Sequence, residues 1–492
     1  MACLILTVLL FRIGRSLGVR CFKPGGYTMN RAKTMGFLMV QAVLVCFPVI
    51  ADEPEKIIEK IQSFDVKPSP LTAITGCEHS ATCLLGYYDG SIERMDLETG
   101  TRTEVCRGVA PIRHIALSND EQQWCAVVSG QDEEVHLVFG QFDGSSALNV
   151  IPLANGLRLR GCYAEFSPDG KFIGISVRGL KDNSSVFFVA HCETTEILWE
   201  SNTKSTVTST SGLPQLFGLT WIGDHKVVFL SNQSKSGSAV RIIDAATLID
   251  MSPLDRRRHI NLKRKPESIQ VPGEILQIRA AIDKKSIIVL SDLDPKTTLL
   301  KVAFFKCALS NPEGQASPAA QAELLSQMPQ SHYLRDYVYL MNDEGSFLVN
   351  LRQPNAGGFS VAYELYVVHP AGVKLIERSN APAILLAAEN SVRLQHDRNN
   401  ETSFLFGYVK IDEQQSLLAI RHHPTETRDD GVFDLNFQGR HPTSVMAGDK
   451  PRYLVIAAVN VVLPFIPDVP TRIQQPPVSP IVVAELVPAI GS

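Results

Sequence analysis

The stretch FSPDGKFIGIS, from Phe166 to Ser176, decides the fold expected for this chain of 492 residues. A Ser-Pro-Asp-Gly turn separates an apolar residue from the largely apolar run that follows it. Proline sets the first torsion of a turn, aspartate hydrogen-bonds to the backbone two residues on, and glycine accepts a positive φ without cost. Asp169 and Gly170 therefore predict a tight corner between two antiparallel strands.

The same corner recurs along the chain. The segment LTAITGCEHSATCLLGYYDGSIERMDLETGTRTEV, residues 71–105, contains four apolar runs separated by polar turns, which predicts one antiparallel meander. Its corner and those of the later segments are spaced 41 to 60 residues apart, at His79, Asp120, Asp169, Asp224, Asp283, Asp343, Asn390 and Asp449. A four-strand unit repeated in this way indicates sheets stacked around an axis, where each sheet buries both of its faces.

Residues 71–105 resemble a blade of the WD-repeat family. The stretch DGSIERMDLETG stands where that family has an Asp-Gly turn, a third strand ending in Trp-Asp, and a polar turn; here Met95 replaces the tryptophan and Asp96 keeps the aspartate. Ile243 and Asp244 give VRIIDAATL a similar ending. The SPDGKFIGIS corner is typical of WD-repeat-like and surface-layer-type bacterial β-propellers. The Gly-His and Trp-Asp pairs are missing, so the resemblance implies a divergent, secreted propeller.

The resemblance implies an all-β fold, a β-propeller of four-stranded antiparallel blades over residues 71–463. We favour seven blades, because seven steps of similar length separate the corners, with eight as the alternative. Residues 52–70 are expected to be a short linker or helix, since PEKIIEKIQSF is amphipathic. Residues 464–492 are expected to be a Pro-rich tail that cannot join a central strand. The segment SPAAQAELLSQM, 317–328, predicts a short helix on an inserted loop.

Residues 1–51 look like a targeting leader. The uncharged run ending at Ala51 follows basic residues and precedes the acidic DEPE, which is the order of a secretory signal cleaved between Ala51 and Asp52. Translation is expected to start at Met29 or Met35, because the apolar run before them would make an unusually long leader. The mature chain is therefore predicted to be secreted or periplasmic. The alternative is an uncleaved segment that anchors it to the membrane.

The net charge limits the classes of partner that are expected, and the cysteines allow one possible disulfide. A net charge of −4 and a pI near 6.3 provide no global positive field, which argues against nucleic acid as a partner. Cys77 and Cys83 could bridge a hairpin, although two small apolar strand residues would look the same. A basic loop could hold an anionic polymer or lipid surface, although a solvated loop explains it as well; its residues are Arg256, Arg257, Arg258, Lys263, Arg264 and Lys265.

The sequence contains no recognisable motif for a catalytic nucleophile, a nucleotide, a zinc site or covalent haem. A loose polar group near the C-terminal end could bind a transition metal; its residues are His396, His422, His423, Asp429, Asp430, Asp434 and His441. Adjacent histidines on a strand point to opposite faces, so a charged loop is the simpler interpretation. We therefore expect no catalytic residue, metal or cofactor. The favoured function is an exported, non-enzymatic binding or scaffolding module whose partner is another protein or an envelope polymer.

Two alternative functions remain open. One is a propeller enzyme, lactonase-like or cofactor-bearing, which would need acidic, histidine or arginine side chains converging at the mouth of the channel. The other is a surface-layer or anionic-polymer-binding structural protein, and the basic loop is its only support. Fold by itself does not separate these functions.

Overall fold

A computed structural model shows how the chain folds. It divides into two compact units, Met1–Glu55 and Lys56–Ser492, and the structure describes residues of the second unit only, between 58 and 486. The longer gaps in this description are 207–217, 253–266, 309–321, 386–402 and 459–479, and shorter gaps fall in other loops. From β24 to β32, the description covers the backbone but almost no side chains. The signal-peptide prediction, including the start and cleavage sites, lies outside the described residues.

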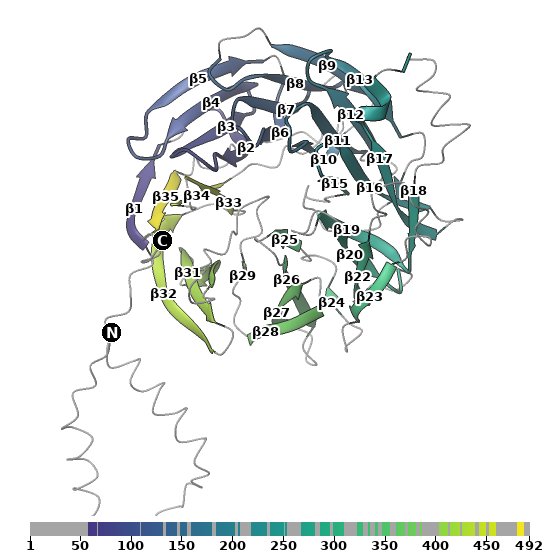
Figure 1. The fold of residues 1–492 in the computed structure, drawn as a ribbon. Coiled ribbons are helices and arrows are strands. Elements are labelled where there is room, and N and C mark those ends of the chain that lie inside the picture. Colours follow the sequence, from purple (N-terminus) through teal and green to yellow (C-terminus); the bar gives the residue numbers. More distant parts are fainter. Residues whose placement is uncertain are drawn as a thin grey trace, which may run out of the picture. The chain divides into compact units, whose positions relative to one another are not determined.

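The described part is almost entirely β-structure (Figure 1). The strands of the first three sheets are β2 (Leu71–Gly76), β3 (Thr82–Tyr87), β4 (Ser91–Asp96), β5 (Arg102–Arg107), β6 (Ile112–Leu117), β7 (Gln123–Ser129), β8 (Val135–Gln141), β9 (Asn149–Ala154), β10 (Leu159–Phe166), β11 (Phe172–Gly179), β12 (Ser184–His191), β13 (Glu196–Glu200) and β14 (Ser205–Thr206). The next two sheets contain β15 (Leu219–Ile222), β16 (Lys226–Gln233), β17 (Gly237–Asp244), β18 (Glu267–Val271), β19 (Glu274–Ala280), β20 (Ser286–Asp292), β22 (Val302–Ala308) and β23 (Ala322–Gln327).

The remaining elements complete the unit. They are the strands β1 (Ile58–Phe64), β21 (Leu299–Leu300), β24 (Tyr333–Leu334), β25 (Leu340–Asn342), β26 (Phe347–Pro354), β27 (Val361–His369), β28 (Gly372–Ser379), β29 (Ile384–Leu385), β30 (Ser403–Ile411), β31 (Gln414–His423), β32 (Glu426–Phe437), β33 (Pro442–Ala447), β34 (Tyr453–Ala458) and β35 (Ile481–Leu486), with the short helix α3 (Ala246–Ile249). No helix among the described residues is long and apolar enough to cross a membrane.

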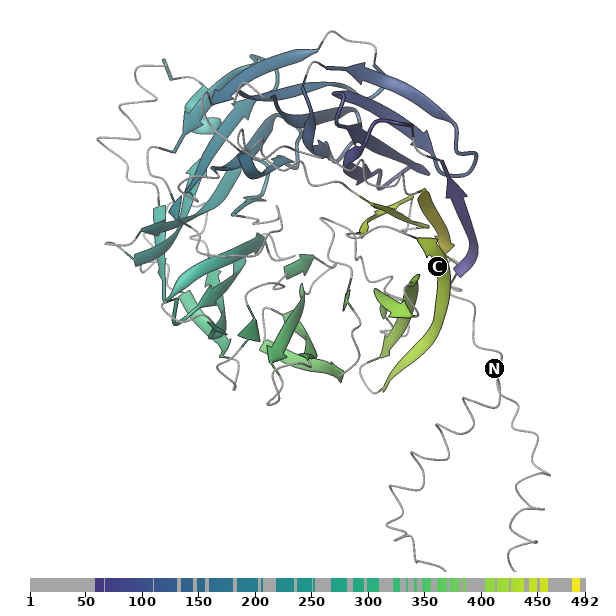
Figure 2. The same ribbon diagram turned by 180° about the vertical axis from the view of Figure 1, so that it is seen from behind.

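Antiparallel sheets follow one another in chain order, which confirms the predicted all-β propeller of four-stranded antiparallel blades. The first strand of each sheet is called here its inner strand, because β33, β2, β6, β10, β15, β19 and β25 contact one another in that order. The views from both sides show these strands toward the centre (Figures 1 and 2). Each sheet is thus one blade.

The described strands form eight such sheets, seven of four strands and one in which β14 adds a fifth. This is the alternative count, and the favoured count of seven is not confirmed. Each of the eight predicted corner residues lies in the chain between the first and second strands of a different sheet. Eight corners therefore mark eight blades, although only seven steps separate them.

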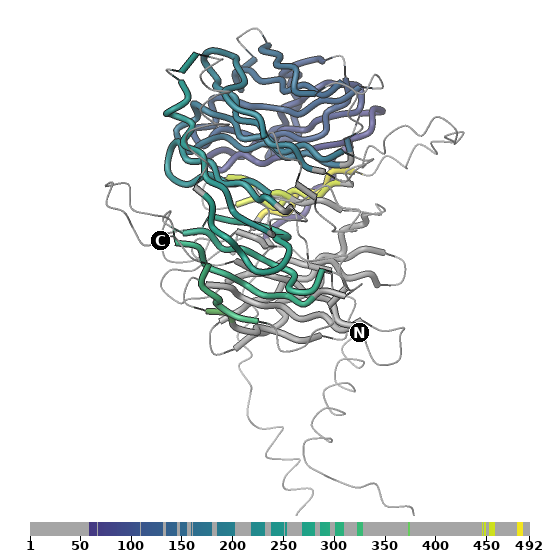
Figure 3. The backbone as a smooth tube through the Cα atoms, turned by 90° about the vertical axis from the view of Figure 1, so that its right-hand side faces the viewer, coloured from purple at the N-terminus to yellow at the C-terminus, as the bar shows by residue number. Residues whose placement is uncertain are grey.

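The final sheet joins the two ends of the unit. Its strand order is β1-β35-β34-β33, and β1 pairs antiparallel with β35 from Ile58↔Leu486 to Phe64↔Ile481. The side view shows the yellow C-terminal strands beside the purple N-terminal ones (Figure 3). The inner strand β33 contacts β2, so this sheet also packs against the first blade. Pairing of the N-terminal strand with the last sheet closes the ring.

Three local predictions are corrected by these strands. Ile58–Phe64 is a strand and not a linker or helix, because β35 offers it an unpaired edge. Ile481–Leu486 is a central strand and not part of a tail; it begins directly after Pro480, so none of the prolines interrupts its hydrogen bonding. Ala322–Gln327 is β23, paired with β22, where the sequence pattern suggested a helix.

The core lies between the blades. Apolar side chains from facing sheets form shared clusters, and one of them combines residues of the closing sheet, such as Val455 and Val483, with Leu85 and Met95 of the first blade. The three tryptophans also pack in the core, since Trp124 of β7, Trp199 of β13 and Trp221 of β15 are all buried. Each blade is therefore stabilised by its neighbours as well as by its own strands.

The corner that opened the sequence analysis forms as predicted. The Asp169 carboxylate accepts hydrogen bonds from Ser167 Oγ (2.7 Å) and from the Lys171 backbone N–H (3.2 Å), and Gly170 has φ 72°. The Asp120 carboxylate, at the corner of the preceding blade, accepts equivalent bonds from Ser118 Oγ (2.6 Å) and the Gln122 N–H. The Ser-x-Asp pattern thus marks the same turn in two blades.

Replacing this aspartate should weaken the turn by a modest amount. We expect Asp169→Ala to lower the free energy of unfolding by about 1–2 kcal/mol, since it removes two local hydrogen bonds. Chemical denaturation measures this loss. Asp224→Ala is the control, because the described residues offer no hydrogen bond to its corner carboxylate, and an equal loss in both variants would contradict the assignment.

Candidate functional site

The site residues predicted from sequence are only partly described. The basic loop from Arg256 to Lys265 lies outside the described residues, as do the side chains of His422 and His423. Cys77 and Cys83 are both buried free thiols, so the suggested hairpin disulfide is not formed, and the two residues act as small core side chains. In the described part of the chain, no group of three or more His, Cys, Asp or Glu residues could hold a metal ion.

Turns at one end of the closing sheet and of the two blades that follow it are joined to each other. This corner end consists of the turns between first and second strands and between third and fourth strands. The Glu121 carboxylate accepts hydrogen bonds from the His79 N–H (2.6 Å) and from Ser80 Oγ (3.2 Å) of the preceding corner. Gly448 N–H donates to the Cys77 carbonyl (2.9 Å), which links the closing sheet to the first blade. The corner end is thus a linked surface.

Glu121, which makes this link, has a strained backbone conformation. Its φ is 54°, at the position that Gly170 occupies in the next corner with φ 72°. A left-handed backbone costs a non-glycine residue on the order of 1 kcal/mol, and such strain persists where the surroundings compensate for it. Here the compensation is the carboxylate that spans two blades. Glycine would suit the turn better, so the role of Glu121 at this position is the contact between the two blades.

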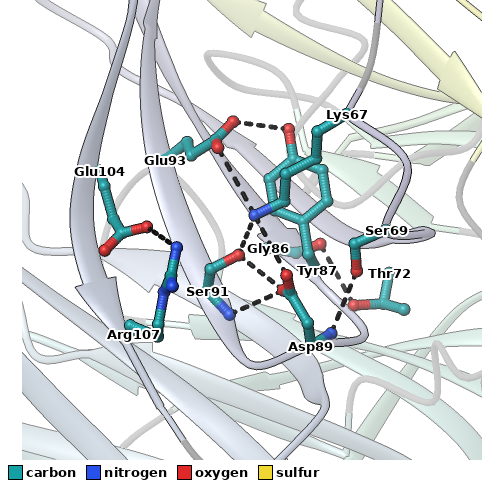
Figure 4. Close-up of polar contacts among 10 residues, drawn as sticks. All are labelled: Lys67, Ser69, Thr72, Gly86, Tyr87, Asp89, Ser91, Glu93, Glu104 and Arg107. Carbon is teal, nitrogen blue, oxygen red and sulfur yellow. Dashed lines mark hydrogen bonds and ion pairs between the residues drawn. The ribbon is translucent and has the colours of Figure 1, made fainter.

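A second polar group lies at the opposite end of the first blade (Figure 4). Lys67, from the connection between β1 and β2, places its Nζ 3.9 Å from the centre of the Tyr87 ring and 3.5 Å from carboxylate oxygens of both Asp89 and Glu93. Nζ also contacts Ser91 Oγ, and Tyr87 OH donates to Glu93 (2.9 Å). We call these five residues the seam cluster, because they fasten the chain that leaves the closing sheet to the first blade.

The electrostatics of the seam cluster suit a structural role. Burial raises the pKa of the Asp89 carboxyl, but hydrogen bonds from Ser91 and the charge of Lys67 outweigh burial, and the net pKa is lowered. Burial, followed by the nearby Glu93 charge, raises the pKa of Tyr87. The ammonium therefore lies in a pre-formed pocket of one aromatic face and two carboxylates. All of its partners come from the chain itself, which leaves it little capacity for a ligand.

Loss of the Lys67 charge should lower the free energy of unfolding, because it removes the cation of the seam cluster. We expect Lys67→Met to cost about 1–2 kcal/mol, because its apolar stem is retained while the partly buried Glu93 and the exposed Asp89 lose their cation. Thermal denaturation at low and high salt measures the effect. The control is Lys60→Met, which changes an exposed lysine of β1 and should be neutral. Equal stability of the two variants would contradict a fastening role for Lys67.

The inner strands carry a feature that sequence reasoning missed. β2, β6, β10 and β19 each have a register shift near the start of their pairing with the second strand. A β-bulge re-aims the side chains that follow it. In β6 the shift falls between Ile112 and His114, and in β19 between Ile275 and Gln277. These bulges have no local signature in the sequence, because they depend on the pairing partner.

After the bulges, polar side chains from the inner strands come together. His114 Nε2 lies 3.0 Å from the Ala164 carbonyl, and its ring centre is 5.1 Å from that of Tyr163. Tyr163 OH donates to Glu165 Oε2 (3.1 Å). The charges of Arg279 and His114 both act on the Glu165 carboxyl. We call His114, Tyr163, Glu165 and Arg279 the axial cluster, since β6, β10 and β19 are inner strands.

Glu165 is the group of this cluster with the clearest perturbation. Its surroundings desolvate the carboxyl and raise its pKa to about 7, although the Arg279 charge, the Tyr163 hydrogen bond and the His114 charge each lower it. The residue as a whole nevertheless keeps an intermediate solvent exposure. Perturbed carboxyls are frequent at functional sites.

Comparison with known proteins adds no functional information. No protein-family model and no curated protein sequence matches the chain. Among solved structures, it is similar to the C-terminal WD40 domain of Sif2, with 11% identity over 87% of this chain and 98% of that domain and a TM-score of 0.49. It is also similar to the Cps50 (Swd1) β-propeller domain of Myceliophteria thermophila, with 10% identity over 87% and 100% and a TM-score of 0.42. Function is therefore argued from this chain's own residues.

Proposed function

We propose that this protein is an exported β-propeller that acts as a binding or scaffolding module, with the corner end as its docking surface for another protein. The observation that supports this proposal is the hydrogen-bonded chain of corners from β33 through β2 to β6. Linked turns lose little conformational entropy when a partner binds them, so more of the contact energy contributes to affinity. Propellers vary such loops without disturbing the blades.

The exposed residues of the corner end indicate the partner's chemistry. Acidic side chains outnumber basic ones among them, and they include Glu78, Glu98, Asp120, Asp169, Lys171 and Glu193. A surface of this kind favours a partner with a complementary basic patch. Export, either as a secreted or periplasmic chain or with a retained anchor, is the second part of the proposal, and the charge pattern of residues 1–51 supports it.

Cross-linking and co-purification from the native envelope fraction test this function. Residues 52–492 are used as bait, and an unrelated secreted propeller is the reference. We expect a protein that is enriched over the reference and is lost from the double variant Glu78→Lys, Glu193→Lys, which reverses two exposed acidic charges of the corner end. The matched control is Arg107→Glu, since Arg107 is exposed at the opposite end of β5. Retention by both variants, or no enrichment at all, would contradict the proposal.

The alternative of a surface-layer or anionic-polymer role depends on the basic loop, outside the described residues, and stays a prediction. Its test is salt-sensitive retention on an anionic polymer that is lost when Arg256, Arg257 and Arg258 become serine. The enzyme alternative requires acidic, histidine or arginine side chains that converge near the axis. Among the described residues, the axial cluster has side chains of these types, but it contains no defined nucleophile.

A further inference from the structure

The outer strand of the second blade has a sheet edge that carries no charge. The strand of each sheet farthest from its inner strand is called here the outer strand, and β9 is the outer strand of the sheet β6-β7-β8-β9 (Figure 1). Proteins commonly protect such edges with charged side chains, because an exposed edge pairs readily with another strand. The other outer strands each contain at least one charged residue; they are β5, β13, β18, β23, β28, β32 and β1. β9 contains none, and neither does the longer stretch 144–157 around it.

Apolar side chains are exposed along the same edge. Val150 is 56% exposed, the highest value among the large apolar residues of the described part of the chain, and Leu148 is 39% exposed. Pro152, two residues further on, is exposed as well. Alternate residues of an extended chain point to the same face, so Leu148, Val150 and Pro152 form one line. We call these three residues the rim row.

Packing holds this strand in place from both faces. Ile151 and Leu153, which alternate with the rim row, are buried in a cluster shared with the third blade. On the face of the rim row, a Cβ at Gly140 would lie 3.4 Å from both Leu148 Cδ2 and Trp124 Cζ2. The absence of a side chain at Gly140 therefore lets Leu148 approach the Trp124 ring. A strand that is already fixed loses little conformational entropy when another strand pairs with it.

Charged residues border the rim row on the neighbouring blades. The outer strands of these blades carry exposed ionic side chains, which are Glu104 and Arg107 on β5 and Glu196 and Glu200 on β13. An apolar centre inside a polar rim is how protein interfaces are commonly built. A charged strand added to β9 would place its charges against apolar side chains, where their desolvation is costly. The edge of β9 therefore favours an uncharged strand.

We propose that β9 pairs antiparallel with the β9 strand of a second copy of this chain. The second copy fits because its β9 is an uncharged strand of the same length, so no charge is buried on either side. A two-fold axis at Val150 places the two Val150 side chains opposite each other, and Leu148 of each copy opposite Pro152 of the other. Every member of the rim row then faces an apolar side chain across the strands.

The backbone of β9 is compatible with this register. Proline in an edge strand keeps its missing N–H on the free side, and backbone groups two residues apart point to the same side. Val150 therefore directs its N–H and carbonyl away from β8, and at the two-fold axis these groups bond to those of the other copy. Pro152 removes one donor from the edge but leaves its carbonyl as an acceptor.

A contact along one short strand is small, so we expect reversible association and not an obligate dimer. The same patch is used on both copies, so the contact closes on itself and stops at two. This inference goes beyond the docking function of the corner end. None of the acidic corner residues belongs to the rim row, and a dimer would present two corner ends to a partner.

Sedimentation velocity of the full chain, from about 1 µM upward over two orders of magnitude, tests this inference. We expect a monomer–dimer equilibrium. Val150→Lys should weaken it at least about tenfold, because it places two ammonium groups opposite each other at the axis. The matched control is Leu324→Lys, because Leu324 is similarly exposed (53%) on the outer strand β23, which already carries Glu323. This control should dimerise like the wild type.

A cross-link keeps the test decisive if Val150→Lys does not fold. In Val150→Cys the two new thiols meet at the axis within the range of a disulfide, so oxidised glutathione should produce a covalent dimer. Leu324→Cys should stay monomeric under the same treatment, and the native cysteines of the described residues are buried. A monomer at every concentration, a dimer that Val150→Lys leaves unchanged, or no cross-link in Val150→Cys would overturn the proposal. None of these results bears on capture of a protein at the corner end.

Discussion

A chain that starts at Asp65, and therefore lacks β1, is expected to lose its cooperative thermal transition. Six residue pairs join β1 to β35. At roughly one backbone hydrogen bond per pair, worth about 0.5–1.5 kcal/mol each, the loss is about 3–9 kcal/mol. This is comparable to the whole stability of a typical domain. Circular dichroism during heating measures the transition.

The control is a chain that starts at Lys56, which keeps β1 and should melt like the full-length protein. Removal of β1 also leaves β35 as an unprotected sheet edge, so aggregation is expected to accompany the loss. A synthetic peptide of residues 56–66 should restore part of the transition, because it can occupy the vacant edge. If the chain starting at Asp65 melts like the control, the closing sheet does not depend on β1.

Glu165→Gln is expected to stabilise the protein at alkaline pH and to have no effect in acid. The folded-state pKa of about 7 is higher than the ordinary value of 4.5, so the folded state binds the proton more tightly than the unfolded state. The contribution of Glu165 is most favourable below pH 4.5 and is lost as the pH rises through 7. Above pH 8 the variant should be about 1–3 kcal/mol more stable than the wild type.

Denaturant unfolding of both proteins from pH 4 to pH 9 measures this difference. Glu193→Gln is the matched control, because Glu193 is fully on the surface of the corner end and its replacement should be neutral at every pH. The prediction is contradicted if the difference between Glu165→Gln and the wild type does not grow between pH 5 and pH 8. It is also contradicted if the variant is the less stable protein at pH 8.

The repeated unit could be predicted because its chemistry is local. Asp120 and Asp169 recur in corners where aspartate bonds to the adjacent backbone, and four apolar runs per unit indicate one meander. The blade count was harder to predict, because counting the steps between the corners omits one blade. Ala322–Gln327 reads as a helix from its composition, and β22 instead provides a pairing partner that makes it a strand.

The ends of the chain show where local reasoning failed. Residues 58–64 carry apolar side chains at helical spacing, Ile58, Ile61 and Phe64. A strand forms there instead because β35, more than four hundred residues away in the chain, offers its edge. The seven prolines after residue 463 suggested a tail, yet Ile481–Leu486 between two of them is uninterrupted and pairs on both sides. A hydrogen-bonding partner so distant in sequence leaves no local pattern.

The sequence by itself determined the all-β class and the repeated corner, since each depends on residues close together in the chain. Only the tertiary structure decided how the ring closes and which polar side chains meet. Glu165 and Arg279 are 114 positions apart, and neither belongs to a recognisable motif. They interact because equivalent positions of inner strands reach the same level of the axis. Radial stacking brings such residues together, and no spacing along the chain records it.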